Sequence, residues 1–146
     1  MSISTRQKHR ILILIALVIL VYIASFYQAP PENVIYDESD ISELFTDKRS
    51  DEQIHVTALV TRLLPDDTKG SAHQRFIVTL SNGMSMLVAH NIDLAPRIND
   101  LNVGDEIELF GEYEWNKQGG VVHWTHHDPS NKHIHGWIKY QGQLYQ

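Results

Sequence analysis

The chain has 146 residues, with 12 basic and 18 acidic side chains, nine histidines and no cysteine. This length leaves room for one folded domain of ordinary size, and it excludes a multidomain enzyme. An apolar content of 42% with three tryptophans argues against a disordered chain. The lack of cysteine excludes a disulfide scaffold, a thiolate zinc site, an iron–sulfur cluster and a cysteine nucleophile.

Residues 11–27 are apolar throughout, except for Ser25. At about 1.5 Å per residue, a helix of this length extends about 25 Å, which is at the short end of what crosses a bilayer. Three bases lie in residues 1–10, whereas the first base after the apolar run is Lys48. Because basic residues remain in the cytoplasm, we predict a single-pass anchor with its N-terminus in the cytoplasm and the C-terminal domain outside it. In a bacterium this corresponds to the inner membrane, with the domain in the periplasm.

A cleaved signal peptide has the same basic start and apolar middle, and it is the alternative to a membrane anchor. Cleavage needs small side chains at the last and third-from-last positions before the cut. A cut after Ala29 would put Tyr27 at the outer position and Pro30 directly after the cut. A cut after Ser25 would put Ile23 at the outer position. These poor sites favour an uncleaved anchor.

The chain beyond the apolar run is strongly acidic. Three of the 12 bases lie in residues 1–10, so nine bases remain against 18 acidic residues. No stripe of clustered lysine and arginine is present in this part of the sequence. Since binding to a phosphate backbone depends on such clusters, nucleic acid is a disfavoured partner. The expected partners are the membrane, through residues 11–27, and an envelope protein or a small ligand.

Residues 28–52 are predicted to form an acidic linker with one short helix. Two consecutive prolines follow the apolar run and impose an extended exit from it. Between Ser39 and Asp51, apolar residues recur at the i, i+3, i+4 spacing of one helix face, and Ser39 or Asp40 can cap the start. We expect this helix to pack on the folded domain.

From residue 53 onward, apolar and polar side chains alternate, which is typical of strands that bury one face. The predicted strands are His55–Leu64, Gln74–Leu80, Met84–Ile92, Gly104–Trp115 and Val121–His127, with a short hairpin at Trp137–Tyr145. Residues 93–102 are expected to form a helical turn or an irregular crossover. The alternation directs Phe76, Val88 and Leu109 inward and Glu108 outward.

Five strands of this length leave exposed edges unless the sheet closes. We therefore predict a mainly β fold, a five-stranded OB-like barrel over residues 53–146, with the transmembrane helix and the short acidic helix before it. A split barrel or another small β-sandwich is the alternative. Trp115 and Trp124 are expected to close the barrel core, since each lies on an alternating strand.

Four long blocks of sequence, and a set of tail residues, carry a family resemblance. The blocks are His73–Phe76, Ala89–Arg97, Gly111–Asn116 and Gly119–Pro129, and the tail residues are His133, Gly136–Ile138 and Tyr145–Gln146. They resemble the signature blocks of a bacterial family, the domain of unknown function number 3465. The resemblance covers most of residues 53–146 and implies a small exported OB-like protein. It implies no activity, because the family has none assigned.

Six of the nine histidines lie after residue 89. His126 with Asp128, and His133 with His135, occupy alternate positions of an extended chain, about 6–7 Å apart on one face. A turn at residues 129–131 would bring His133 back toward the strand before it. We therefore predict His126, Asp128 and His133 as ligands of a divalent transition metal such as zinc. The alternative is that these histidines are solvated or packed.

A second set of polar and aromatic residues is predicted to bind a ligand. The set consists of Arg75, His90, Arg97, Glu112, Glu114, His123 and Trp137. Arginine facing glutamate usually forms an exposed ion pair worth less than about 1 kcal/mol. A thermonuclease-like site would in addition need Asp66 and Asp67. Trp137 is expected to line a groove together with His133.

These observations predict a non-catalytic domain that binds a ligand or an envelope protein outside the cytoplasm. The alternative is a metal-binding barrel with a redox, metal-handling or hydrolytic task. The sequence has no nucleotide fingerprint, no phosphate-binding glycine loop and no Ser-His-Asp arrangement at interpretable spacing.

Overall fold

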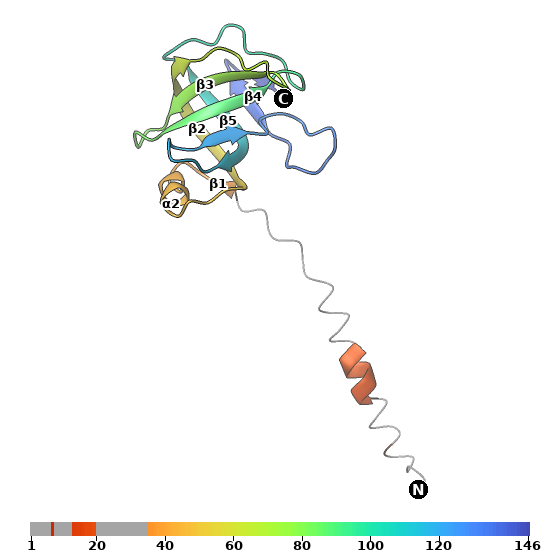
Figure 1. Cartoon of the computed structure of the whole chain (residues 1–146). Coiled ribbons are helices and arrows are strands. Elements are labelled where there is room, and N and C mark those ends of the chain that lie inside the picture. Colours follow the sequence, from red (N-terminus) through yellow and green to blue (C-terminus); the bar gives the residue numbers. More distant parts are fainter. Residues whose placement is uncertain (1–6, 8–12, 20–34) are drawn as a thin grey trace. The chain divides into compact units, whose positions relative to one another are not determined.

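The computed structural model describes residue 7, residues 13–19 and residues 35–146 (Figure 1). In the first compact unit, Met1–Asn33, residues 13–19 are helical. Most of the predicted membrane span lies outside the described residues, as do the candidate cleavage sites. Among the residues that are described, no helix is long and apolar enough to cross a membrane.

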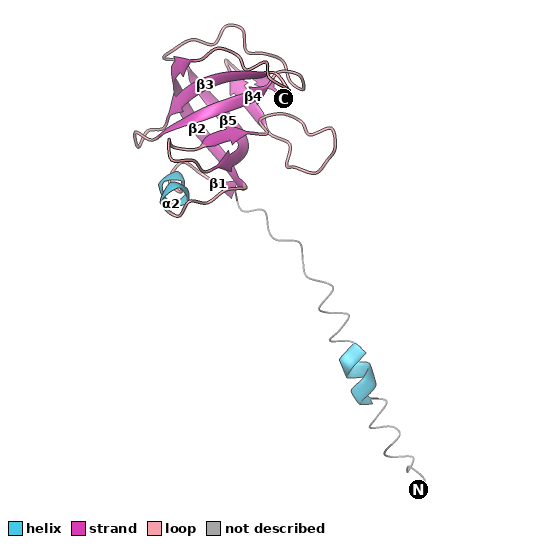
Figure 2. Cartoon of the chain, viewed as in Figure 1, coloured by secondary structure: helices cyan, strands magenta, loops and turns pink. Residues whose placement is uncertain are grey.

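The second compact unit, Val34–Gln146, consists mainly of strands (Figure 2). Its elements are β1 (Ile35–Tyr36), α2 (Ile41–Thr46), β2 (Glu52–Leu63), β3 (His73–Thr79), β4 (Ser85–Asn91), β5 (Glu106–Glu114), β6 (Val121–His123), β7 (Trp137–Tyr140) and β8 (Gln143–Tyr145). This unit includes most of residues 28–52, the segment that the sequence assigns to a linker.

Strands β2 to β6 form a closed barrel. The strand order is β2-β3-β4-β6-β5, and β5 pairs in turn with β2. All of these pairings are antiparallel except β4–β6, which is parallel. This is the Greek-key connectivity of an OB fold, so the predicted mainly β fold with a five-stranded barrel is confirmed. The hairpin β7–β8 extends the sheet from β5, and β1 adds a parallel strand beside β2.

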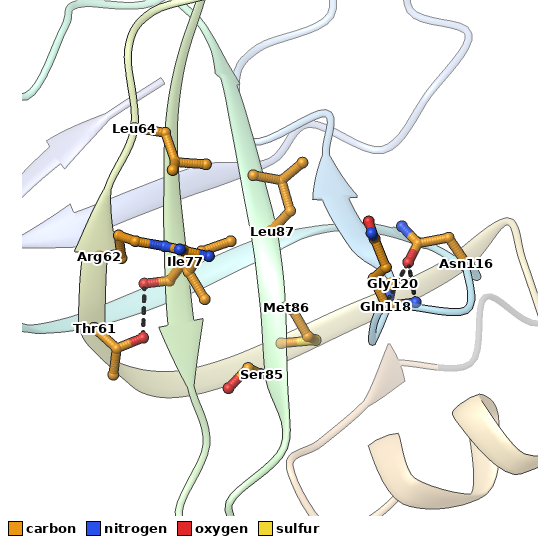
Figure 3. A pocket seen from close by; sticks show the side chains of 10 residues that line it. All are labelled: Thr61, Arg62, Leu64, Ile77, Ser85, Met86, Leu87, Asn116, Gln118 and Gly120. Carbon is orange, nitrogen blue, oxygen red and sulfur yellow. Dashed lines mark hydrogen bonds between the residues drawn. The ribbon is translucent and has the colours of Figure 1, made fainter.

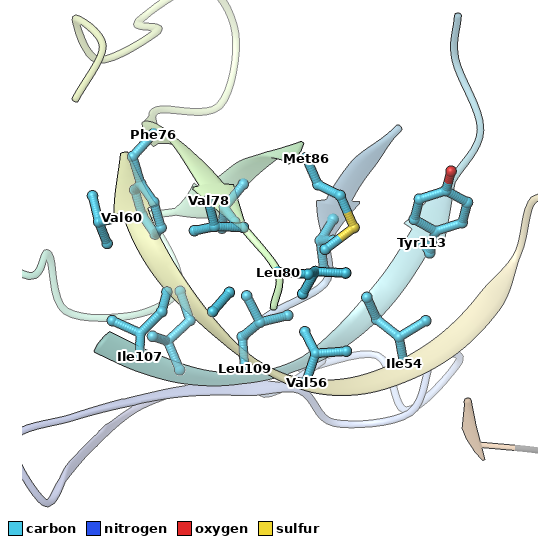
Figure 4. Close-up of a cluster of buried hydrophobic side chains, with 14 of the residues drawn as sticks. Ile54, Val56, Val60, Phe76, Val78, Leu80, Met86, Ile107, Leu109 and Tyr113 are labelled. Carbon is cyan, nitrogen blue, oxygen red and sulfur yellow. The ribbon is translucent and has the colours of Figure 1, made fainter. Parts of the chain in front are cut away.

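Alternate residues of each barrel strand point into one apolar core (Figure 4). On β5 the inward positions include Ile107, Leu109 and Tyr113, and the outward positions that alternate with them are exposed or half-buried. Phe76 and Val88 have no exposed surface, as predicted, and neither has Leu109. The inside–outside phase derived from the alternation is therefore correct for these strands.

Helix α2 contributes to this core. Ile41 and Leu44 are 0% and 1% exposed and belong to the same cluster as the barrel side chains. The helix is shorter than the predicted segment, and Asp40 at its N-cap position makes no side-chain capping hydrogen bond. Trp115 holds the helix from the barrel side, because its indole N–H donates to the Phe45 carbonyl at 3.0 Å.

Two expectations about the later part of the chain need correction. The fifth barrel strand ends at His123 rather than His127, because Trp124 has a positive φ of 51°, which turns the chain out of the strand. Trp124 is half-buried and does not belong to the core cluster, whereas Trp115, also half-buried, packs against that cluster as expected. The crossover between β4 and β5 is irregular, which is one of the two forms expected, and the Gln74 side chain fixes it by hydrogen bonds of 2.9 Å to both backbone groups of Ile98.

Replacing Phe76 with alanine should lower the free energy of unfolding by roughly 3–5 kcal/mol, because it leaves a cavity in a fully buried site. Glu108→Ala is the matched control on the outer face, where the carboxylate contacts His55 and Lys139. Its cost should be about 0.5 kcal/mol or less, since exposed ion pairs contribute little. Chemical denaturation of the full chain, followed by tryptophan fluorescence, measures both. A larger effect at Glu108 would contradict the assigned core.

Candidate functional site

A groove lies on the outer face of the barrel, over β3 and β4 (Figure 3). Its volume is about 640 Å³. Leu64, Ile77 and Leu87 give it an apolar surface, and the polar side chains around them come from β2 and from the turn between β5 and β6. The residues that line it are Thr61, Arg62, Leu64, Ile77, Ser85, Met86, Leu87, Asn116, Gln118 and Gly120.

Two smaller depressions adjoin this groove. One of about 250 Å³ shares Leu87 with it and extends to His73 and His123. The next, of about 210 Å³, shares both histidines and extends to Trp124 and His126. Together the three depressions follow the outer face of β3 and β4 from one end to the other.

The turn between β5 and β6, at one end of the groove, is stabilised by the side chain of Asn116. The Asn116 Oδ1 accepts hydrogen bonds from the backbone N–H groups of Gln118 and Gly120, at 2.8 and 3.1 Å. These hydrogen bonds fix the backbone of the turn. The side chain of Gln118 therefore lines the groove from an ordered backbone.

The two predicted arginines brace the loop between β2 and β3. Arg75 donates from Nε and Nη2 to the Pro65 carbonyl at 3.1 and 3.0 Å, and it lies 3.8 Å from Asp67. Arg97 donates to both carboxylate oxygens of Asp66, at 3.0 and 3.3 Å. Neither arginine contacts Glu112 or Glu114. The acids that a thermonuclease-like site would require are thus neutralised by the arginines themselves.

Glu112, Glu114 and His123 come together on the outer face of β5 and β6. One donor atom from each lies within 4.8 Å of the other two. Glu112 stands directly opposite His123 in the β5–β6 ladder, and Glu114 is two residues further along the same face. All three residues are among the ligand-binding residues predicted from the sequence, and in the structure they lie next to one another.

Two glycines allow His123 to reach this position. A Cβ at Gly111 would lie 2.6 Å from the His123 carbonyl oxygen and 2.8 Å from the Thr125 Cγ2, distances that real side chains do not tolerate. A Cβ at Gly136 would collide with the Trp124 carbonyl oxygen. The backbone after β6 is therefore packed directly on β5 and on the chain before β7.

The predicted metal ligands His126, Asp128 and His133 serve other contacts. Both carboxylate oxygens of Asp128 accept hydrogen bonds from the loop that follows, including the backbone N–H groups of Ser130, Lys132 and His133 at 2.7–2.9 Å. Burial raises the pKa of Asp128, but these hydrogen bonds outweigh it and hold the pKa well below its usual range. The His126 Nδ1 lies 2.9 Å from the His127 carbonyl oxygen.

His133 points toward Glu112. Its ring stacks on Trp124 with 3.7 Å between centroids, and its Nδ1 lies 3.3 Å from the Glu112 Oε2. Neither Trp137 nor His133 lines the groove or the two depressions described above. Trp137 packs between His55 and Phe110, with ring centroids 5.3 and 5.8 Å away.

His90 is fully buried and bridges two segments. Its Nε2 lies 3.2 Å from the Pro96 carbonyl, which can only accept, so Nε2 carries the proton and donates. Its Nδ1 then accepts from the Thr125 hydroxyl at 2.9 Å. Burial lowers the pKa of His90 to about 4. This histidine holds the crossover against the segment after β6, rather than facing a ligand.

Several groove residues are absent from the sequence-based candidates. They include Arg62, Leu64, His73, Ile77, Leu87, Asn116 and Gln118. The alternating pattern identifies two of them, because Ile77 and Leu87 are large apolar residues at outward positions of predicted strands. An apolar residue in an outward position is common on protein surfaces, however, and only the closed barrel shows that these lie side by side.

The comparison with protein families gives a match that covers most of the chain. The family model described as "Protein of unknown function (DUF3465)" matches residues 20–146. The chain belongs to the DUF3465 family. The match confirms the resemblance carried by the sequence blocks and extends beyond them toward the N-terminus. No curated protein matches the chain.

The buried His90 should make the stability of this DUF3465 protein depend on pH. Its pKa of about 4 in the folded state lies below the ordinary value of about 6.5, so the folded state favours the neutral ring. The contribution of His90 to the free energy of unfolding is therefore fully present above about pH 6.5. This contribution falls by about 3 kcal/mol in total as the pH drops toward 4.

Unfolding midpoints in urea between pH 4 and 7.5 measure this effect. The His90→Gln variant should be less stable at neutral pH but should lose less stability on acidification than the unmodified chain. His127→Gln, at an exposed position, is the control and should retain the full slope. Equal slopes in the unmodified chain and His90→Gln would contradict the assignment.

Proposed function

We propose that this DUF3465 protein is a non-catalytic binding domain that holds an extended peptide segment of another envelope protein. The groove along the outer face of β3 and β4 carries this proposal. In OB folds the same face and its flanking loops take extended ligands. A volume of about 640 Å³ for its main part is within the range of ordinary ligand sites.

The chemistry of the groove favours a peptide over nucleic acid. Leu64, Ile77 and Leu87 offer apolar contacts for side chains, while Gln118 can bond a peptide group. Arg62 can pair with a carboxylate or a carbonyl oxygen of the ligand. A nucleic-acid site would instead need a row of cations, and the chain carries a formal charge of −6. The elongated course of the groove favours an extended segment over a compact small molecule.

The place of action that we propose is the periplasmic side of the inner membrane, with residues 11–27 as an uncleaved anchor. Support comes from the sequence: seventeen residues with one polar interruption, preceded by three bases and followed by an acidic segment. The partner would then be an envelope protein within reach of the tethered barrel.

Photocrosslinking in intact cells tests the binding proposal. A benzophenone amino acid at Ile77, inside the groove, should give a discrete crosslinked protein that the same group at exposed Leu144 on β8 does not give. Leu87→Asp, added to the Ile77 probe, should reduce the crosslink about tenfold or more, because it places a charge on the apolar contact. Identical products from both probe positions, or no effect of Leu87→Asp, would contradict the groove as the binding site.

The orientation in the membrane is tested separately. An alkaline phosphatase fused to the C-terminus should be active, and a cytoplasm-dependent fluorescent protein at the same position should be dark. Intact mass should show an N-terminus at or next to Met1. An inactive phosphatase would reject the periplasmic location, and a start near residue 26 or 30 would replace the anchor by a cleaved signal.

A further inference from the structure

The cluster of Glu112, Glu114 and His123 combines two carboxylates and one imidazole at the side of the groove. Its donor atoms lie within 4.8 Å of one another. The three side chains project from two hydrogen-bonded strands, with Glu112 and His123 in direct register. Their relative positions are therefore set by the β-ladder rather than by a loop.

Among the described residues, the negative charge of this cluster has no lysine or arginine paired with it. In the described part of the chain, the ion-pair contacts of Glu112 are with His123 at 3.5 Å and His133 at 3.3 Å, and Glu114 makes none. Glu108, another outward carboxylate of β5, differs, since it contacts Lys139 at 3.0 Å. Two half-buried carboxylates side by side repel each other unless a cation lies between them.

His123 presents an unused nitrogen to the same point. Its Nε2 is shielded from solvent and makes no hydrogen bond, since its contact with Glu112 at 3.5 Å lacks the required geometry. A neutral ring with a free nitrogen is the form of histidine that binds metal ions.

We propose that Glu112, Glu114 and His123 bind one divalent transition metal ion, through two carboxylate oxygens and the His123 Nε2. The donor set suits zinc, iron or manganese, because imidazole disfavours calcium and magnesium while the lack of sulfur disfavours monovalent copper. His133, stacked on Trp124, positions Glu112 from the side. The site differs from the one predicted at His126, Asp128 and His133, and it is independent of the peptide-binding proposal.

Zinc titration of the full chain tests the site. The protein, purified in mild detergent and stripped with a chelator, should bind one zinc ion per chain in isothermal titration calorimetry. His123→Ala and Glu114→Gln should each weaken this binding about tenfold or more, because each removes a direct ligand. Cobalt added to the stripped protein should give visible absorption bands that are lost in both variants.

The chain offers a matched control on another face of the barrel. His55 and Glu108 form a histidine–glutamate pair at 2.8 Å between β2 and β5, without the third donor. His55→Ala and Glu108→Gln should therefore leave zinc affinity unchanged, and circular dichroism should confirm that all four variants are folded. The proposal is overturned if the unmodified chain shows no saturable binding, or if His123→Ala and Glu114→Gln bind zinc as well as the controls do.

Discussion

The pairing of β2 with β5 is the contact on which the rest of the structure depends. Eight residue pairs, from Glu52 opposite Tyr113 to Leu59 opposite Glu106, close the sheet into a barrel. The pairs join segments about fifty residues apart, so their formation must overcome a large loss of chain entropy. This loss is offset by burial of apolar side chains in one core, because closure removes the two edges of the barrel sheet and encloses the inward face of every strand. The irregularity in β2 between Val60 and Arg62 lets the same strand turn from β5 to β3.

The same ladder connects the core to the outer surface through Gly111. This residue lies opposite Ile54 inside the closing ladder, and its missing side chain leaves room for His123 and Thr125. Thr125 then holds the buried His90, while His123 faces Glu112. A single small residue in the barrel wall thus sets both a buried hydrogen bond and the outer cluster. The site is rigid for this reason, since it belongs to the barrel rather than to a loop attached to it.

Much of the fold could be predicted from local sequence, because alternation reports which side of a strand is buried. Phe76, Val88 and Leu109 follow from that rule alone. The end of β6 does not follow from that rule. The positive φ of Trp124, which ends the strand, is imposed by packing against distant segments such as Gly136. The meeting of Glu112, Glu114 and His123 depends on the register between two strands, and register depends on the turn and on the whole barrel. The residue types of the site were therefore predictable, whereas their grouping was not.

The different fates of the carboxylates follow from the backbone around them. Asp128 lies where the chain reverses, and a reversal leaves backbone N–H groups without partners, so a nearby carboxylate accepts hydrogen bonds from them. Glu112 and Glu114 lie on a regular strand whose N–H groups are used in the ladder. Their carboxylates can be neutralised only by another side chain or by a bound cation. A carboxylate on a strand face without a lysine or arginine beside it is thus a better indicator of a ligand than a buried one in a turn, even where the turn carries more histidines.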